Sequence, residues 1–224
     1  MMAGICFEIK DQHLWLLPQK AIFWEEQKML MLSDLHFGKS THFRKAGIPV
    51  SVKVFQKSLD VLSHLLDTLN PATICFLGDL FHSDINIEFE WFDTWMKKYP
   101  GVSMELVRGN HDIFPASVYK KAGIKVFPLA VHKGPFVFAH DPQYDGSIND
   151  YIISGHIHPG VQLKGTGRQS LCLPCFYFGK NQALMPAFGE FTGLALIQPK
   201  KNDRVFVIGD GKVYAVSTSL PTFA

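Results

Sequence analysis

The chain has 224 residues, of which 47% are hydrophobic and 13% aromatic, and its formal net charge is only +2. This composition excludes a mainly disordered protein and provides enough apolar surface for a large core. The small positive charge is compatible with a phosphate-bearing substrate, but it does not by itself indicate nucleic-acid binding. Because no run of about 18 apolar residues is present, no membrane-spanning helix is predicted.

The N-terminal segment and the cysteines favour a cytoplasmic protein. Residues 1–10 have no basic start and no sustained apolar stretch, so they do not resemble a signal peptide. Four cysteines are too few and too scattered for the disulfide framework of a secreted domain. Cys172 and Cys175 have C-x-x-C spacing, but no second pair completes a zinc site, and we expect the spacing to be coincidental.

Strands and helices are predicted to alternate in the first half of the chain. Residues 5–24 are aromatic and interrupted by turn residues, which predicts one or two edge strands. Apolar runs predict buried strands over residues 28–33, 73–77 and 102–107. Apolar residues at helical spacing predict helices over residues 51–69 and 87–98.

The second half is predicted to contain mostly strands. A short helix over residues 115–122 precedes strands over residues 124–127, 136–138, 151–154, 193–198, 204–208 and 212–217. Residues 160–189 are rich in glycine and proline, and their structure is the hardest to assign. This order predicts an α/β protein in which a second sheet packs on a central α/β layer. Since no repeat or linker is visible, we expect a single domain over residues 1–224.

Five short polar clusters follow apolar runs in a fixed order. They are Asp34-Leu35-His36, Gly78-Asp79, Gly109-Asn110-His111-Asp112, His140 and Gly155-His156-Ile157-His158. Because groups just past the carboxyl ends of strands meet at one edge of an α/β sheet, we expect these clusters to converge. The glycines would permit tight turns and close approach of the backbone.

The clusters contain hard oxygen donors and imidazoles. The plausible metal ligands are Asp34, His36, Asp79, Asn110, His140, His156 and His158. This mixture suits two divalent ions; we expect Mn²⁺, and Fe, Zn, Ni or Mg ions are alternatives. One carboxylate can bridge two ions, and a pair of ions can stabilise the attacking and leaving oxygens of a phosphoryl displacement. Any single cluster is also compatible with a turn or a solvated loop, whereas the ordered set predicts one composite metal site.

The ordered clusters resemble the signature of the calcineurin-like metallophosphoesterase superfamily, namely D-x-H, G-D, G-N-H-[DE], a lone H and G-H-x-H. The resemblance spans Asp34 to His158. It implies an α/β fold, a four-layer αββα sandwich of two mixed β-sheets flanked by helices. It also implies a dinuclear site at the rim of the sheets, where the two cations generate a hydroxide nucleophile from water.

The resemblance also implies a role for each residue of the clusters. The first metal would be held by Asp34, His36 and His158, the second by Asn110, His140 and His156, and Asp79 would bridge them. His111 would contact the phosphate or protonate the leaving oxygen as a catalytic residue. Asp112 would support it by holding its other ring nitrogen.

A narrower resemblance concerns residues 33–39 (SDLHFGK), 78–83 (GDLFHS), 173–179 (LPCFYFG) and 185–193 (MPAFGEFTG). These segments are similar to those of the bacterial DNA ligase-associated, PdeM-like branch. The branch implies a phosphodiesterase or nuclease that is linked to DNA repair and associated with a DNA ligase, a helicase and an exonuclease. The alternatives are a phosphomonoesterase, a pyrophosphatase acting on nucleotides or lipid precursors, and a non-catalytic scaffold, which the intact ligand set argues against.

Several other residues are candidates for substrate contacts, and each also has an ordinary structural reading. His82 and Asp84 follow the expected bridging carboxylate, and Arg108 precedes a cluster, where a structural role is favoured. A basic segment that could grip flanking phosphates contains Lys39, His42, Arg44 and Lys45. Aromatic residues that could stack on bases are Phe176, Tyr177, Phe178, Phe188 and Phe191, although most are expected in the core.

Overall fold

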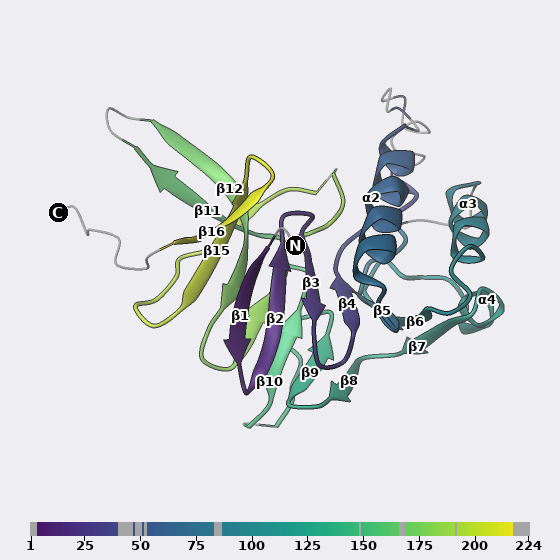
Figure 1. Ribbon diagram of the computed structural model, residues 1–224, viewed down its shortest axis with the longest axis horizontal. Helices are drawn as coiled ribbons and strands as arrows, with labels where there is room; N and C mark the ends of the chain where they lie inside the picture. Colours follow the sequence, from purple (N-terminus) through teal and green to yellow (C-terminus); the bar gives the residue numbers. More distant parts are fainter. Residues whose placement is uncertain are drawn as a thin grey trace.

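The computed structural model describes residues 4–39, 47, 51, 53–82, 87–147, 149–165, 169–190 and 192–216. Seven strands form one mixed sheet in sequence order (Figure 1): β1 (Ile5–Ile9), β2 (Gln12–Leu17), β3 (Ala21–Trp24), β4 (Met29–Leu32), β5 (Thr73–Leu77), β6 (Ser103–Val107) and β7 (Ile124–Phe127). The pairs from β1 to β4 are antiparallel, and those from β4 to β7 are parallel. The four parallel strands therefore end at the same edge of the sheet.

Helices cover one face of this sheet. They are α2 (Lys53–Leu69), α3 (Ile87–Met96) and α4 (Ala116–Lys121). Helix α2 buries Phe55, Leu59 and Leu62 along one face, because residues three or four apart lie on the same side of a helix. Side chains along β4 alternate between the two faces of the sheet. Leu30 packs in the core beneath the helices, whereas Met31 packs in the core on the opposite face.

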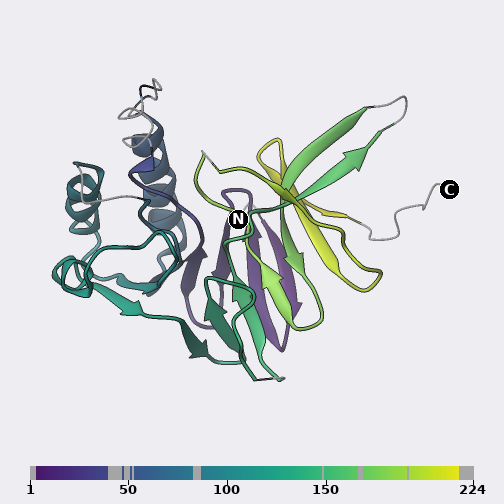
Figure 2. The ribbon, with the colours of Figure 1, turned by 180° about the vertical axis from the view of Figure 1, so that it is seen from behind.

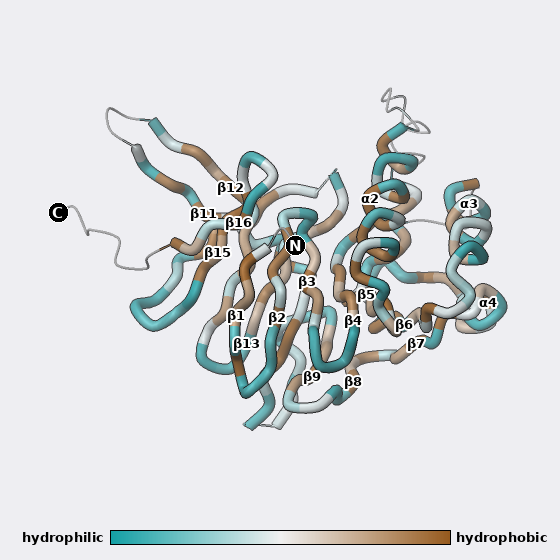
Figure 3. Tube along the Cα trace, in the orientation of Figure 1, coloured by the Kyte–Doolittle hydropathy of each residue, from teal (hydrophilic) through white to brown (hydrophobic). Residues whose placement is uncertain are grey.

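A second mixed sheet covers this opposite face (Figure 2). Its strands are β8 (Ala130–Lys133), β9 (Phe136–Ala139), β10 (Tyr151–Ser154), β11 (Pro159–Lys164), β12 (Ser170–Phe178), β13 (Gln182–Leu184), β14 (Ala195–Leu196), β15 (Arg204–Gly209) and β16 (Lys212–Val216). Strands β9, β10 and β13 are parallel neighbours. Figure 3 shows hydrophobic residues concentrated in the strands of both sheets and hydrophilic residues in the turns.

The expected fold class, α/β with two mixed sheets and flanking helices, is confirmed. Within the described part of the chain all helices lie on the first sheet. The outer helical layer over the second sheet in a four-layer sandwich is therefore not among the described elements. No helix in the described ranges is long and apolar enough to cross a bilayer.

Most predicted elements are confirmed with small shifts at their ends, and a few assignments were wrong. The N-terminal segment forms three strands, because two short turns fold it into an antiparallel meander. Strand β8 was missed, since its side chains are only half-buried and give no apolar run. The segment 193–198 retains only the two residues of β14.

The C-x-x-C spacing of Cys172 and Cys175 does not place the two thiols side by side. Both cysteines lie on β12, and residues three apart on a strand point to opposite faces of the sheet. Cys172 is exposed, whereas Cys175 is buried and packs in a small core beside Val205 and Val207. The two thiols therefore do not form a metal-binding pair.

Candidate metal centre

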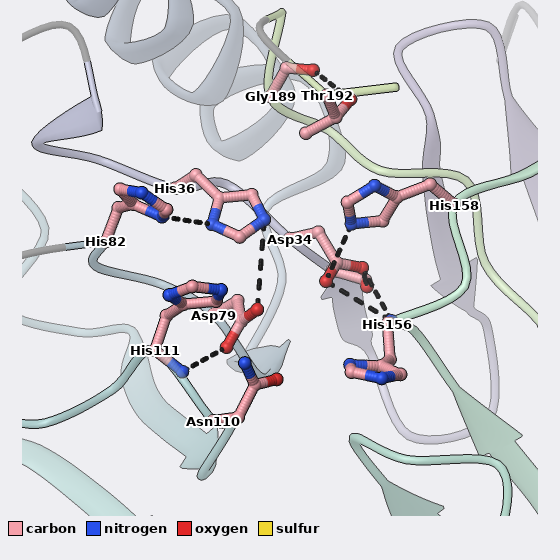
Figure 4. Close-up of polar contacts among 12 residues, drawn as sticks. Asp34, His36, Asp79, His82, Asn110, His111, His156, His158, Gly189 and Thr192 are labelled. Atoms are coloured by element: carbon pink, nitrogen blue, oxygen red, sulfur yellow. Dashed lines mark hydrogen bonds and ion pairs between the residues drawn. The ribbon is translucent and has the colours of Figure 1, made fainter. Parts of the chain in front are cut away.

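The predicted metal ligands lie just after the carboxyl ends of strands from both sheets (Figure 4). Strands β4, β5 and β6 are parallel, and so are β9 and β10, so each set ends at one edge of its sheet. The packing of the two sheets places these edges together. Two groups of potential ligand atoms result, with the atoms of each group within 4.8 Å of one another: Asp34, His36 and His158, and Asp79, His140 and His156.

The first group is organised around the carboxylate of Asp34, which is completely buried. His158 Nε2 lies 3.2 Å from Asp34 Oδ1. The backbone N–H of His156 donates to Asp34 Oδ2 over 3.0 Å, and the Ser33 hydroxyl donates to the same oxygen. These contacts fix the orientation of the Asp34 side chain. Asp34 follows β4, whereas its partners His156 and His158 follow β10.

The second group is organised around His140, whose ring is almost fully buried. Its Nδ1 lies 3.0 Å from the carbonyl oxygen of Leu77, which can only accept, so Nδ1 carries a hydrogen. Its Nε2 therefore faces the site, where Asn110 Oδ1 lies 3.1 Å away and His156 Nδ1 lies 3.0 Å away. Asn110, an expected ligand, thus joins this group through its amide oxygen.

The carboxylate of Asp79 belongs to the second group and also faces the first. Its Oδ2 is 3.8 Å from His36 Nε2 and 3.5 Å from His140 Nε2. Its other oxygen accepts the backbone N–H of His111 over 2.9 Å. One oxygen of Asp79 is therefore directed toward both groups, as a bridging ligand requires.

The backbone of the site is strained in a consistent way. Positive φ angles occur at Asp34 (54°), His36 (51°), Asp79 (50°), His156 (67°) and His158 (53°). Such angles cost non-glycine residues about 1–3 kcal/mol each and persist only where surrounding contacts enforce them. Here the loops brace one another, because His36 N–H donates to Asp79 O over 2.8 Å and Asp34 N–H donates to Gly78 O over 3.1 Å.

Two glycines allow the loops to approach this closely. A Cβ atom on Gly78, which has a φ of 81°, would lie 2.7 Å from Cβ of His140 and closer still to its ring. A Cβ atom on Gly155 would lie 2.9 Å from Cβ of Ser33 and 2.5 Å from Asp34 Oδ2. The expectation that glycines permit close backbone approach therefore has a specific structural basis at both positions.

Burial and the clustered charges shift the pKa values of the site. Burial lowers the pKa of His36 to about 4 against the opposing pull of Asp79 and Asp34, so this ring is neutral and can act as a ligand. Burial also disfavours a charged His140, but the Asp79 carboxylate outweighs it and raises the pKa of His140 to about 9. Burial raises the pKa of Asp79, yet His140 and the His111 N–H outweigh this effect and lower it to about 2.

The donor set fits a pair of divalent cations. Two buried carboxylates face four imidazoles and one amide oxygen, the mixture that borderline divalent ions accept. In the absence of metal, the proton on His140 compensates the charge of the Asp79 carboxylate. A bound cation would compensate the same carboxylate. The buried negative charge of the site is therefore matched to cations.

His111 lies beside the ligand groups and is not a member of either. Its ring is half-buried and stacks on His82, with centroids 4.5 Å apart and planes at 30°. It also makes an edge contact with His36 at 5.4 Å. His82, for which the sequence is compatible with either a substrate contact or an exposed loop, contacts the rings of His36 and His111. Its Nδ1 lies 3.3 Å from His36 Nδ1.

The predicted contact between Asp112 and the His111 ring is not found in the structure. Both oxygens of Asp112 accept backbone N–H groups, from Gly109 over 2.9 Å and from Phe81 over 3.1 Å. No hydrogen bond joins Asp112 to His111 among the described residues. Burial raises the pKa of Asp112 to about 6, although these two N–H donors oppose the shift. Asp112 therefore ties the loop after β5 to the loop after β6.

The remaining candidates divide into core residues and residues that lie outside the described ranges. Phe176, Phe178 and Phe188 are buried in the two main cores, and the hydroxyl of Tyr177 donates to Asp203 over 2.9 Å, so these rings serve packing rather than base stacking. Arg108 donates to the carbonyl oxygens of Asp112 and Phe114 in the favoured structural role. Asp84, His42, Arg44, Lys45 and Phe191 lie outside the described residues.

Two supporting contacts were missed from the sequence. The carboxylate of Glu88 on α3 is buried and accepts the N–H of Gly38 over 2.6 Å, which holds the loop that carries His36. The N–H of Gly189 donates to Asp34 O over 3.1 Å. A glutamate in the first turn of a helix reads as a solvated residue, and a backbone donor leaves no signal in the side-chain pattern.

Comparison with known proteins agrees with this geometry. The family described as calcineurin-like phosphoesterase matches residues 28–160. The crystal structure of Pseudomonas putida nuclease MPE is similar to this chain at 30% sequence identity and a TM-score of 0.81, covering 95% of this chain and 100% of that one.

More distant structures add no weight to the assignment. The phosphoesterase Yfce from E. coli has 13% identity and a TM-score of 0.42, covering 85% of this chain and 93% of that one. A protein of unknown function from Aquifex aeolicus has 20% identity and a TM-score of 0.39, covering 62% and 82%. No curated protein matches the chain. The family match and the nuclease structure are sufficient: the chain belongs to the calcineurin-like phosphoesterases, hydrolases that act on phosphate esters.

Proposed function

We propose that this protein is a dinuclear metal-dependent phosphodiesterase that cleaves nucleic acid. The observation that carries the proposal is the position of Asp79 Oδ2. It lies 3.5 Å from His140 Nε2 of its own ligand group and 3.8 Å from His36 Nε2 of the other group. A bridging carboxylate of this kind is what a two-metal phosphoryl-transfer site needs. The similarity to a nuclease over nearly the whole chain favours a phosphodiester substrate.

The ligand groups divide the work between two sites. Asp34, His36 and His158 would hold one ion, Asn110, His140 and His156 would hold the other, and Asp79 would bridge them. We expect Mn²⁺, because the mixed oxygen and nitrogen donors suit it, with Fe, Zn, Ni or Mg as alternatives. When bound, the pair of ions neutralises the phosphate and lowers the pKa of water for attack on phosphorus.

His111 acts on the substrate as a catalytic residue. Its half-buried ring lies against His36 and His82 at the border of the site, where it can hydrogen-bond a phosphate oxygen or give a proton to the leaving oxygen. Its backbone N–H holds Asp79, so the loop that presents the ring also orients the bridging carboxylate. Asp112 acts one step further away, as a positioning residue that fixes the backbone on both sides.

The wider role follows from the narrower resemblance of the chain. We place the protein in DNA repair, in the cytoplasm, as a single catalytic domain whose substrate is DNA or RNA. A DNA ligase, a helicase and an exonuclease are the expected partners. The nuclease neighbour supports the substrate class, and its 100% coverage supports treating the chain as one catalytic unit.

The mechanism is tested with two substitutions and a small aryl phosphodiester. Asp79→Asn is expected to lower metal content and nearly abolish turnover, because the shared ligand loses its charge. His111→Ala is expected to keep both metal ions and to lower kcat by about 10²–10⁴-fold, the usual contribution of proton transfer. His64→Ala, which changes an exposed histidine on α2, serves as the control and should behave as the wild type.

Near-normal turnover by either site variant at saturating metal would overturn this mechanism. Fewer than one ion per wild-type chain would instead indicate a non-catalytic scaffold. Comparing aryl diesters with aryl monoesters separates a phosphodiesterase from a phosphomonoesterase. Assays on single-stranded DNA, duplex DNA, RNA and cyclic nucleotides, run side by side, then identify the natural substrate class.

A further inference from the structure

A pocket of about 130 Å³ lies next to the metal centre and contains two lysines. It is formed by the turn between β2 and β3, by α2 and by the segment 188–190. Lys20, Lys57 and Glu190 line it together with the apolar side chains of Pro18, Val61 and Phe188. The segment 188–190 is hydrogen-bonded to the metal-site loop, because the N–H groups of Phe188 and Gly189 donate to Ser33 O and Asp34 O.

The charges in this pocket are not balanced. Lys57 Nζ lies 3.3 Å from Glu190 Oε1, and both side chains are largely exposed. Lys20 has no ion pair or side-chain hydrogen bond among the described residues, although it is half-buried beside the apolar walls formed by Pro18, Val61 and Phe188. Burial lowers the pKa of Lys20; Glu190 opposes this shift and the like charge of Lys57 adds to it. An anion bound here would relieve an uncompensated cation.

A smaller hollow relates the lysine pocket to the metal site through shared lining residues. It shares Ser58 and Glu190 with the lysine pocket, and His36 and Lys39 also line it. The backbone N–H of Lys39 donates to His36 O over 3.1 Å, so this lysine is held beside a metal ligand. Lys39 therefore lines the hollow beside the metal ligand His36, and Lys57 and Lys20 line the neighbouring pocket.

We propose that the lysine pocket binds a phosphate that flanks the scissile phosphate of a nucleic-acid strand; this inference rests on the proposed function. A lysine ammonium is a compact charge that suits phosphate oxygens, and a single strand presents phosphates at regular intervals. Lys20 is the principal anchor, because Lys57 is shared with Glu190. The pocket thus selects a polynucleotide over a small diester that reaches only the metal centre.

Equilibrium binding tests the pocket directly. Fluorescence anisotropy of a labelled single-stranded oligonucleotide is measured with metal-loaded protein carrying His111→Ala, which is expected to slow cleavage. Lys20→Met, which keeps the apolar stem and removes the charge, should weaken binding about 3- to 10-fold. It should also reduce the slope of log K against log salt by about 0.7, the value for one phosphate contact on a single strand. Lys20→Arg should largely restore binding. Lys212→Met, which changes an exposed lysine at the start of β16, should change nothing.

A second substitution has the opposite expected sign. Glu190→Gln removes the acid of the pocket and frees Lys57, so it should tighten oligonucleotide binding by about 2- to 5-fold. A purely structural role for these residues would weaken binding in both variants. Kinetics of the Lys20→Met variant with His111 intact provide a second measurement. The kcat/KM for the oligonucleotide should fall relative to that for the aryl diester, because the KM for the oligonucleotide rises.

The outcomes separate this inference from the proposed function. Wild-type protein that cleaves neither substrate overturns the proposed function itself. The wild-type protein could instead cleave oligonucleotides while the Lys20→Met variant binds them with unchanged affinity and salt dependence. That result overturns the phosphate-binding role of the pocket alone. Weaker binding in both Lys20→Met and Glu190→Gln also overturns it, because only loosening of the segment would explain the shared sign.

Discussion

Replacing Gly78 with alanine is expected to disable the second ligand group while leaving the first in place. The backbone at Gly78 has a φ of 81°, in the left-handed region, where an alanine costs about 1–2 kcal/mol. The new Cβ atom would also lie 2.7 Å from Cβ of His140 and closer still to the imidazole ring. His140 must therefore move by at least about 0.7 Å to reach an ordinary contact distance of 3.4 Å.

This displacement has no easy outlet. The ring of His140 is only 4% exposed, and its Nδ1–H is bound to Leu77 O at 3.0 Å. A shift breaks that hydrogen bond and moves Nε2 away from Asn110 and His156. Since a misplacement of about 1 Å in a catalytic arrangement can cost about 10²-fold in rate, we expect at least that loss in kcat.

The assay combines metal analysis, phosphodiester turnover and thermal unfolding. Gly78→Ala should bind one ion in place of two. The matched control is Gly123→Ala, because Gly123 has a similar φ of 76° but no atom within 4 Å of the added Cβ. The control should lose about 1 kcal/mol of stability and keep both metal content and turnover. Two tightly bound ions and normal turnover in Gly78→Ala would refute the reasoning.

Three further predictions concern neighbouring groups. Asp112→Ala leaves the buried N–H groups of Gly109 and Phe81 unpaired. Urea denaturation should therefore show a loss of about 2–4 kcal/mol in the free energy of unfolding. A loss below about 0.5 kcal/mol would contradict the role of Asp112 in tying the two loops together. Because His140 has a pKa of about 9 without metal, it must release a proton when metal binds, so the metal affinity should rise with pH up to about 9 and then level off. Calorimetry at pH 7.5 in buffers of different ionisation enthalpy should detect the release of about one proton. Release of no proton would argue against this protonation state. Cys172→Ser should change neither metal content nor turnover, and loss of an ion would show that the thiol does contribute a ligand.

The local elements of the site could be read from the sequence because their signals are local. Short apolar runs followed by polar residues predicted β4, β5 and β10 and placed Asp34, Asp79 and His156 just beyond their ends. The apolar face of α2 repeats every three or four residues, and that period is visible without any tertiary contact. The division of the ligands into two groups came from the family resemblance, which records the same geometry in related chains.

The contacts that orient the site could not be read in this way. Asp112 is adjacent to His111 in sequence, yet its oxygens are taken by the N–H groups of Gly109 and Phe81, and the second of these is 31 residues away. Glu88 has the sequence context of a solvated helix start, but the packing of α3 buries it against Gly38. Hydrogen-bond partners depend on which loops the two sheets bring together, and sequence spacing does not encode that.

The sequence by itself determined which residues could bind metal and where each would lie relative to its own strand, because ligand chemistry and strand periodicity are properties of short segments. Only the tertiary structure decided that Asp79 lies between His36 and His140, since that position requires the rims of two packed sheets to meet. It also decided that Lys20 and Lys57, 37 positions apart in the printed sequence, face one pocket beside the site. Ligand identity is local, whereas the arrangement that permits catalysis is set by long-range packing.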